Sequence, residues 1–335
     1  MQAMNPIDGS RRRLIRRTAL VLAGLSVFRA GLASEALDGA QPFEIHDFGW
    51  YDSARARPVP TRLYLPLGHH DPVRRRSPLP LVVFSHGLGG SRTGYRYLSS
   101  FLASQGFACL HPQHVGSDRS LWAGGSPFSL VDRLLAASRD EEAVQRVLDL
   151  SFSLDQLSQS RFSESIDDGR IVVAGHSYGA NSALLIGGAQ VMREGKPVVL
   201  HDARAKAIIA LSAPPFYGET SPAAILRPMN LPSLHITCTE DTIRIPMLVS
   251  GPEDRLAIFE ASGGLPKCLA MFEGGSHSVF TDREATGGFE TNRRIKLATC
   301  NLVQAFLALV FHREKAPLLG WKAQHESALR QFVWR

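Results

Sequence analysis

The sequence has few cysteines, no repetitive segment and no stretch of low complexity. Its four cysteines are Cys109, Cys238, Cys268 and Cys300, and this number alone fixes no disulfide pairing. Cys238 ends one expected strand and Cys268 begins the neighbouring parallel strand, an offset of roughly 13 Å at the rise of a strand. Because a disulfide needs Cα atoms within about 7 Å, we expect no bond between these two. Cys109, in an apolar strand, is expected to be a core residue.

Acidic residues are nearly absent from the first 33 positions. This segment holds six arginines against one acid, Asp8, and so contributes +5 to the formal net charge of +6. The rest of the chain is therefore close to neutral, with a net charge near +1, and a nucleic-acid partner is not supported. The hydrophobic content of 44% and the charged content of 20% are those of an ordinary globular protein.

The N-terminal segment has the features of an export signal. Its arginines precede an apolar run at residues 19–28 that is too short for a stable membrane-spanning helix. Gly31 and Ala33 suit cleavage after Ala33, and residues 10–15 resemble the twin-arginine export motif. We therefore expect residues 1–33 to be removed and the protein to be periplasmic or secreted in bacteria. An uncleaved amphipathic helix is the alternative.

Beyond the signal, apolar strands alternate with helical segments, which predicts one α/β domain at residues 34–335 with a mostly parallel sheet and helices on both faces. Residues 43–66 contain Pro58 and Pro60 and suit an N-terminal edge hairpin. After residue 33 we expect no apolar segment long enough to span a membrane, and therefore no stable membrane anchor. The strands are expected at residues 79–84, 107–111, 171–174, 205–211, 234–238 and 268–272, and the helices at 95–105, 140–157, 181–192 and 292–312.

A sharp turn in the middle of the chain carries the main motif. The apolar run 171–174 predicts a buried strand, the sequence GHSYG at residues 175–179 fits G-x-S-x-G, and helix-compatible residues follow. Strand, turn and helix form a nucleophile elbow, in which a side chain at Gly175 or Gly179 would collide with a neighbouring element. Five residues can also match by chance, and the alternative is a plain helix N-terminus capped by Ser177.

Two further residues complete a candidate catalytic triad. A serine hydroxyl needs a base that takes its proton, and the base needs an acid that fixes its tautomer. Asp241 and His277 each follow an expected strand, and the carboxyl ends of parallel strands meet at one edge of a sheet. We therefore expect both residues to lie beside Ser177. Glu240 is the alternative acid.

Acyl transfer also requires donors for the oxyanion of a tetrahedral intermediate. We expect the backbone N–H of Tyr178, directly after the serine, and that of Leu88, in the glycine-rich loop at residues 85–90. The alternative for this loop is a simple tight turn. Neither a metal nor an organic cofactor is expected, because histidines such as His111 and His114 are too loosely spaced to indicate a metal site.

These motifs resemble the α/β-hydrolase superfamily. Residues 82–114, VVFSHGLGGSRTGYRYLSSFLASQGFACLHPQH, and the GHSYGA turn are similar to platelet-activating-factor acetylhydrolase and dienelactone-hydrolase-like esterases. The segments CTEDTIRIP and EGGSHSVF are similar to bacterial cutinases and polyester hydrolases. The resemblance implies the α/β-hydrolase fold and a serine esterase that forms an acyl-enzyme on Ser177, with His277 as base and Asp241 as orienting acid.

The chain departs from these families at three places. The acetylhydrolases carry their acid after the preceding strand, where this chain has Ser212 and Ala213, so Asp241 follows the cutinase arrangement. The dienelactone hydrolases use a cysteine nucleophile instead of a serine. Polyester hydrolases commonly place an aromatic residue near the position of Pro214 and Pro215. A polyester hydrolase, a phospholipid acyl hydrolase, an amidase or peptidase, and a non-catalytic binding protein therefore remain as alternatives.

Apolar side chains in two irregular stretches are candidates for substrate binding. Trp122 follows the strand at 107–111, and Phe216 and Tyr217 follow the strand at 205–211. The expected partner is a small-molecule or polymeric ester, and the pattern defines no oligomeric state. The alternative is that these side chains only cover a helix. The same stretches also contain Leu121, Phe128, Ile225 and Met229.

Overall fold

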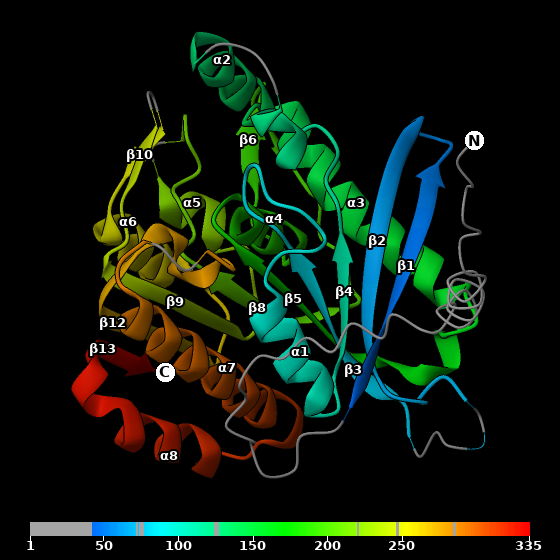
Figure 1. Cartoon of the computed structure of the whole chain (residues 1–335). Helices are drawn as coiled ribbons and strands as arrows, with labels where there is room; N and C mark the ends of the chain where they lie inside the picture. The colour runs from blue at the N-terminus through cyan, green and yellow to red at the C-terminus, as the bar shows by residue number, and fades with distance from the viewer. Residues whose placement is uncertain are drawn as a thin grey trace, which may run out of the picture. The chain divides into compact units, whose positions relative to one another are not determined.

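A nine-stranded sheet forms the centre of the fold (Figure 1). The computed structural model describes residues 42–335 apart from 72, 74–76, 124–126, 220, 246–247 and 284–285. The expected export signal at residues 1–33 lies outside the described residues. In order across the sheet the strands are β1 Phe43–Asp52, β2 Arg57–Pro66, β4 Ala108–Pro112, β3 Leu79–Ser85, β5 Ile166–His176, β8 Ala205–Leu211, β9 Ser233–Glu240, β12 Lys267–Ser276 and β13 Leu329–Trp334.

The six strands from β4 to β12 in this order run parallel to one another, which confirms the mostly parallel sheet. The expected edge hairpin is also confirmed, because β1 and β2 pair antiparallel at one end of the sheet. Pro58 and Pro60 lie in the part of β2 that precedes its pairing with β4, which begins at Thr61. Proline is tolerated there because no second neighbour needs the missing N–H.

Alternate residues of the central strands pack against two different layers of helices. Val172 and Ala174 of β5 belong to a core cluster with α1 (Arg96–Ser104), α7 (Phe289–His312) and α8 (Ala316–His325). The intervening residues, Ile171 and Val173, belong to a second cluster on the other face. This alternation confirms that the strand before the turn is buried on both faces. The second cluster includes side chains of α3 (Asp140–Ser158), α4 (Tyr178–Ile186), α5 (Pro222–Leu226) and α6 (Pro252–Ala261).

The helix after the turn is shorter than expected. α4 ends at Ile186 instead of reaching residue 192, because Gly187 and Gly188 follow and Gly188 has a φ of 109°. The chain then forms a small antiparallel hairpin of β6 (Val191–Arg193) and β7 (Lys196–Val198).

The stretches expected to be irregular contain short elements of their own. α2 (Pro127–Ala137) lies within residues 114–138, and α5 lies within residues 212–230. Residues 243–266 form the hairpin of β10 (Ile243–Ile245) and β11 (Leu248–Ser250), followed by α6. The C-terminal α8 and β13 are also additions to the expected elements, and β13 pairs antiparallel with β12 at the second edge of the sheet.

The expectation that no later segment is long and apolar enough to span a membrane needs correction. Among the described residues, α7 has the required length, with a mean hydropathy of 1.5 over its most apolar window. More than half of that window is buried, at 56%, and its apolar side chains belong to the core cluster with β12 and α1. The hydropathy of α7 therefore reflects burial in the protein core.

The cysteines follow the expectation. All four are free and buried, and burial raises the pKa of each thiol. Cys268 is paired in register with Leu234, and Cys238 with Phe272, so four residues separate the two cysteines along the sheet. This offset accounts for the absence of a bond between them.

Candidate active site

Ser177 occupies a strained turn between β5 and α4. Its φ and ψ are 55° and −124°, outside the regions that L-residues favour. A Cβ at Gly175 would collide with the backbone of Gly179, and a Cβ at Gly179 would collide with the backbone of Ser85 in β3. The Ser177 hydroxyl does not cap the helix. The geometry is therefore that of a nucleophile elbow, and the alternative of a simple helix cap is contradicted.

His277 lies between Ser177 and Asp241. It begins a short 3-10 helix (His277–Phe280) directly after β12. Its Nε2 lies 2.8 Å from the Ser177 Oγ, and its Nδ1 lies 2.7 Å from the Asp241 Oδ1. A carboxylate can only accept, so Nδ1 carries the proton and Nε2 is left to accept from the serine hydroxyl. The three residues come from the ends of β5, β9 and β12 and meet at one edge of the sheet, as expected.

The acid is buried and held in its charged form. Asp241 is completely buried, and its Oδ2 accepts a hydrogen bond of 2.7 Å from the Thr237 hydroxyl. Its Oδ1 also accepts from Arg255 at 3.4 Å. Burial acts to raise the pKa of this carboxyl, but the hydrogen bond from His277 and the charge of Arg255 outweigh burial and hold the pKa well below its ordinary value. The competing acid, Glu240, is exposed.

A second histidine supports the backbone of His277. His176 is buried, and its Nε2 lies 3.0 Å from the His277 carbonyl oxygen, which can only accept. Nε2 of His176 therefore donates, and its Nδ1 accepts a 3.0 Å hydrogen bond from the Tyr95 hydroxyl. Burial lowers the pKa of His176 to about 3, which keeps the ring neutral as this pattern requires. Sequence reasoning missed Tyr95, because no local motif marks it.

The Leu88 N–H of the glycine-rich loop has no acceptor among the described residues. Within the described residues, Gly87 N–H donates to the Tyr95 hydroxyl and Gly89 N–H to the Ser117 carbonyl, whereas Leu88 N–H has no protein acceptor. Tyr178 N–H, at the first position of α4, also has no acceptor there. Both residues line the cavity that contains Ser177. For these two N–H groups the sequence predicts the role of oxyanion donor.

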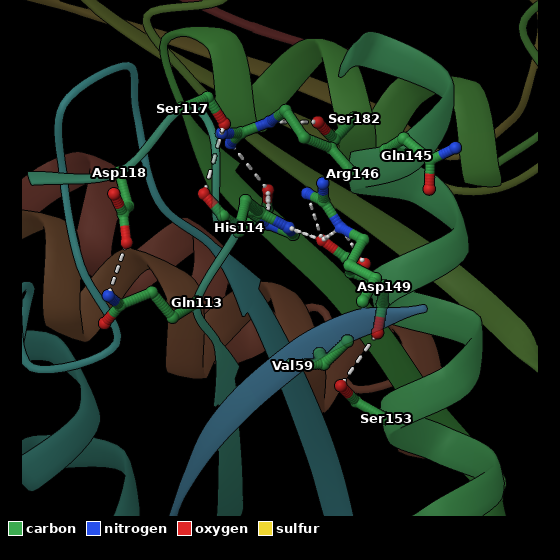
Figure 2. Close-up of polar contacts among 12 residues, drawn as sticks. Val59, Gln113, His114, Ser117, Asp118, Gln145, Arg146, Asp149, Ser153 and Ser182 are labelled. Atoms are coloured by element: carbon green, nitrogen blue, oxygen red, sulfur yellow. Dashed lines mark hydrogen bonds and ion pairs between the residues drawn. The ribbon is translucent and has the colours of Figure 1, made fainter. Parts of the chain in front are cut away.

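A buried polar network contacts the first residue of this loop, and Figure 2 shows its members His114 and Asp149. Asp149 of α3 accepts hydrogen bonds of 2.9 Å from Arg55 and Arg57 of the N-terminal hairpin and one of 3.1 Å from the His114 Nδ1. The Ser85 hydroxyl then donates to the His114 Nε2 at 2.9 Å. Burial lowers the pKa of His114 well below its ordinary value, so the ring is neutral. The network connects the hairpin to the first residue of the loop.

A cavity of about 610 Å³ opens beside Ser177 and His277. Trp122, Phe216 and Tyr217 line it, as expected. The Trp122 indole donates a 2.7 Å hydrogen bond to the Gly89 carbonyl. Most of the wall comes from the segments between the parallel strands and is apolar, with contributions from Leu134, Leu185, Val198, Leu200, Ile245 and Leu248.

Of the other apolar candidates, the three whose side chains the structure describes do not line the cavity. Ile225 and Met229 are buried in the core cluster that contains α4 and α5. Leu121 is buried in a small cluster with Leu134 of α2. For these three, the alternative of packing against a helix is correct. The side chain of Phe128 lies outside the described residues.

Among the described residues, one group of side chains of the types that ligate metals lies apart from the candidate site. The donor atoms of Glu44, His46 and His70 lie within 4.8 Å of one another. A hydrogen bond of 2.7 Å joins His70 to the Glu44 carboxylate. Glu44 and His46 belong to β1, four strand positions from β5 across the sheet, or about 19 Å at the usual spacing. The group therefore does not contact the Ser177 site.

The sheet order, the elbow after β5 and the helices on both faces define the α/β-hydrolase fold. A solved structure shares it: the putative dienelactone hydrolase from Klebsiella pneumoniae subsp. pneumoniae aligns with a TM-score of 0.56. The alignment covers 80% of this chain and 99% of that chain, at 16% sequence identity.

Sequence comparisons indicate similarity to a particular esterase family. The family described as platelet-activating factor acetylhydrolase, isoform II, matches residues 53–124, a segment that contains the glycine-rich loop but precedes Ser177. The acetylhydrolase of Canis lupus familiaris is 29% identical over 156 residues, or 36% of this chain and 34% of that protein. That of Bos taurus is 29% identical over 142 residues, or 31% of each. The chain thus spans about a third of the length of the curated relatives it matches.

Proposed function

We propose that this protein is an exported serine esterase that hydrolyses carboxylic esters through an acyl-enzyme. The observation that carries the proposal is the hydrogen-bonded series from the Ser177 Oγ to His277 and on to Asp241, with separations of 2.8 and 2.7 Å. It opens on an apolar cavity of about 610 Å³. The likeness to the acetylhydrolases supports the same reaction class.

In the first half of the reaction, His277 Nε2 takes the proton from Ser177 as the serine oxygen attacks the ester carbonyl. The carbonyl oxygen becomes negatively charged and accepts hydrogen bonds from the N–H groups of Leu88 and Tyr178. The Asp241 carboxylate stabilises the imidazolium that has formed. His277 then gives its proton to the departing alkoxide, which leaves as an alcohol and leaves an acyl group on Ser177.

In the second half of the reaction, a water molecule replaces the alcohol. His277 takes a proton from this water as it attacks the acyl carbonyl, and the same two N–H groups hold the second oxyanion. The proton then returns from His277 to the Ser177 oxygen, and the carboxylic acid leaves. No step requires a metal or an organic cofactor.

The shape of the cavity favours esters with an apolar acyl or alcohol group. Its wall is mostly apolar in area, although charged side chains such as Arg119, Arg193 and Arg283 also line it, and we expect fit and chain length to set most of the selectivity. We propose a broad esterase with a preference for short to medium acyl chains. A polyester, a phospholipid acyl group or an amide could react at the same residues, and each is an outcome of the test below.

A substrate panel tests the proposal. Purified protein is assayed against p-nitrophenyl esters, the matching p-nitroanilides, a short polyester and a phospholipid with a short acyl chain, and is labelled with a fluorophosphonate. We expect ester hydrolysis to exceed anilide hydrolysis and the label to attach to Ser177. Absence of any hydrolysis would leave the non-catalytic binding protein as the function, and faster anilide hydrolysis would favour an amidase.

A further inference from the structure

One buried arginine of α3 contacts both segments that supply the proposed oxyanion donors. Figure 2 shows it, labelled Arg146, beside Ser117 and Ser182. Arg146 is completely buried. At the glycine-rich loop its Nη2 donates to the His86 carbonyl and to the Ser85 hydroxyl, the latter at 3.1 Å. At the elbow its Nε donates to the Ser182 hydroxyl at 3.1 Å, and its guanidinium lies 4.5 Å from the centre of the Tyr178 ring.

The acceptors around this guanidinium are all neutral. They are the His86 carbonyl and three serine hydroxyls, of which Ser117 accepts from Nη1 at 2.8 Å. Among the described residues, Arg146 has no ion pair with a carboxylate. A buried cation without a paired carboxylate is costly, and this cost must be offset by the hydrogen bonds that hold it.

Among the described residues, hydrogen bonds connect Arg146 to two carboxylates through serine hydroxyls, and both carboxylates already form ion pairs with Arg57. Ser117 accepts from Arg146 and donates to the Glu142 carboxylate at 2.7 Å. Ser85 accepts from Arg146 and donates to the neutral His114, which in turn donates to Asp149. The hydroxyls of Ser117 and Ser85 thus stand between the guanidinium and the carboxylates, so neither carboxylate contacts Arg146 directly. The positive charge therefore stays beside the loop and the elbow.

We propose that Arg146 is a positioning residue for the oxyanion site. It fixes the N–H groups of Leu88 and Tyr178 relative to each other, and it holds a positive charge next to them. Such donors must lie within about 2.7–3.1 Å of the developing oxyanion, and a fixed charge in a buried site stabilises that oxyanion without reorganising. This inference rests on the proposed esterase function and adds a residue to its machinery.

Three variants separate this role from a purely structural one. Arg146→Met removes the charge and every side-chain hydrogen bond of Arg146. Arg146→Lys keeps the charge but has one ammonium group in place of the branched guanidinium. The matched control is Arg204→Met, because Arg204 also holds α3, through Asp155 and the Ser151 carbonyl, and its partners lie outside the loop and the elbow. Thermal melting establishes that each variant is folded.

We expect kcat for p-nitrophenyl butyrate to fall about 10²-fold in Arg146→Met with KM within about threefold, the size of effect seen when an oxyanion donor is lost. Arg146→Lys should recover about tenfold, and Arg204→Met should keep both constants. Affinity for a trifluoromethyl ketone, which adds to the serine and forms an oxyanion, should fall in parallel with kcat/KM. If Arg146 had a purely structural role, its replacement would not lower the ketone affinity and kcat in parallel while KM stayed unchanged.

A folded Arg146→Met variant that keeps kcat within threefold of the wild type, or that keeps its ketone affinity, overturns the inference. If that variant does not fold, Ser182→Ala decides, because it removes the hydrogen bond from Arg146 and the one that Ser182 donates to the Tyr178 carbonyl at 3.2 Å. It should lower kcat and ketone affinity together by about two- to tenfold. No change in either quantity overturns the inference. Wild-type protein that is inactive on every ester refutes the proposed function and this inference with it, whereas active wild type with insensitive variants refutes this inference alone.

Discussion

Replacing Asp241 with asparagine removes a charge while the structure preserves the geometry around it. Oδ1 accepts from two donors, His277 at 2.7 Å and Arg255 at 3.4 Å, and Oδ2 accepts from the Thr237 hydroxyl at 2.7 Å. Arginine cannot accept a hydrogen bond, but a hydroxyl can donate or accept. The amide oxygen should therefore take the Oδ1 place and the amide NH₂ should donate to Thr237. His277 then keeps its tautomer, and the variant loses only the carboxylate charge.

The size of the loss follows from this geometry. With Nδ1 and Oδ1 in contact, the centres of the imidazolium and carboxylate charges lie about 4 Å apart, and two unit charges at that distance attract by about 4 kcal/mol at an effective dielectric constant of about 20. Each ~1.4 kcal/mol is a factor of ten in rate. We therefore expect Asp241→Asn to lower kcat about 10³-fold, with little effect on KM.

The assay is p-nitrophenyl butyrate hydrolysis with thermal melting as a folding check. The matched control is Glu240→Gln, because Glu240 is the neighbouring carboxylate and is exposed, and it should keep kcat within about twofold. The double variant Asp241→Asn with Thr237→Val removes the group that orients the amide and should lose at least about a further tenfold. A kcat for Asp241→Asn within tenfold of the wild type, or an equal loss in Glu240→Gln, would refute the assignment of Asp241.

Four other outcomes are expected. Ser177→Ala should lower turnover about 10⁴-fold or more with an unchanged melting temperature; fluorophosphonate labelling at a different residue would contradict this. Trp122→Ala should change the acyl-chain profile of kcat/KM by at most about 1–3 kcal/mol per methylene, and an unchanged profile would remove Trp122 from substrate contact. Changing Arg11 and Arg12 to lysine should retain the protein in the cytoplasm, and unchanged exported activity would refute that route. Burial lowers the pKa of His176 from 6.5 to about 3, so on acidification the His176 ring takes up a proton in the unfolded chain before it does so in the folded protein. The free energy of unfolding is therefore unaffected by His176 above about pH 6.5 and decreases as the pH falls toward 3. The melting temperature should fall between pH 6.5 and 4, and a constant value would count against a neutral buried His176.

The sequence by itself determined eight of the nine strands of the sheet and the position of the candidate triad. Apolar runs such as residues 171–174 define buried strands because a strand covered on both faces has no polar side. The GHSYG turn defines the elbow because its backbone leaves no space for a Cβ at either glycine. Parallel strands bring their carboxyl ends to one edge, so chain order predicted that Asp241 and His277 lie beside Ser177, with Glu240 left open as the alternative acid.

The shortest strands could not be predicted from the sequence, because a periodic pattern of apolar residues is recognisable only over a longer segment. Each strand of the β6–β7 and β10–β11 hairpins has three residues, too few to show alternation. The end of α4 was placed six residues too late, because residues 187–192 read as helix-compatible while Gly187 and Gly188 end the helix in the structure. These short elements supply part of the cavity wall, including Val198, Ile245 and Leu248, so that part of the wall could not be predicted from the sequence.

Only the tertiary structure decided the polar contacts that support the site. Tyr95 and His176 are 81 positions apart, and His176 and His277 are 101 apart, yet they form one hydrogen-bonded series. Arg146 stands in a helix whose spacing predicts only an amphipathic surface, but it is completely buried between the glycine-rich loop and the elbow. Local patterns encode which residues form a strand, a turn or a helix. Which buried polar atoms meet depends on how distant segments pack, because each donor must find its acceptor across the fold.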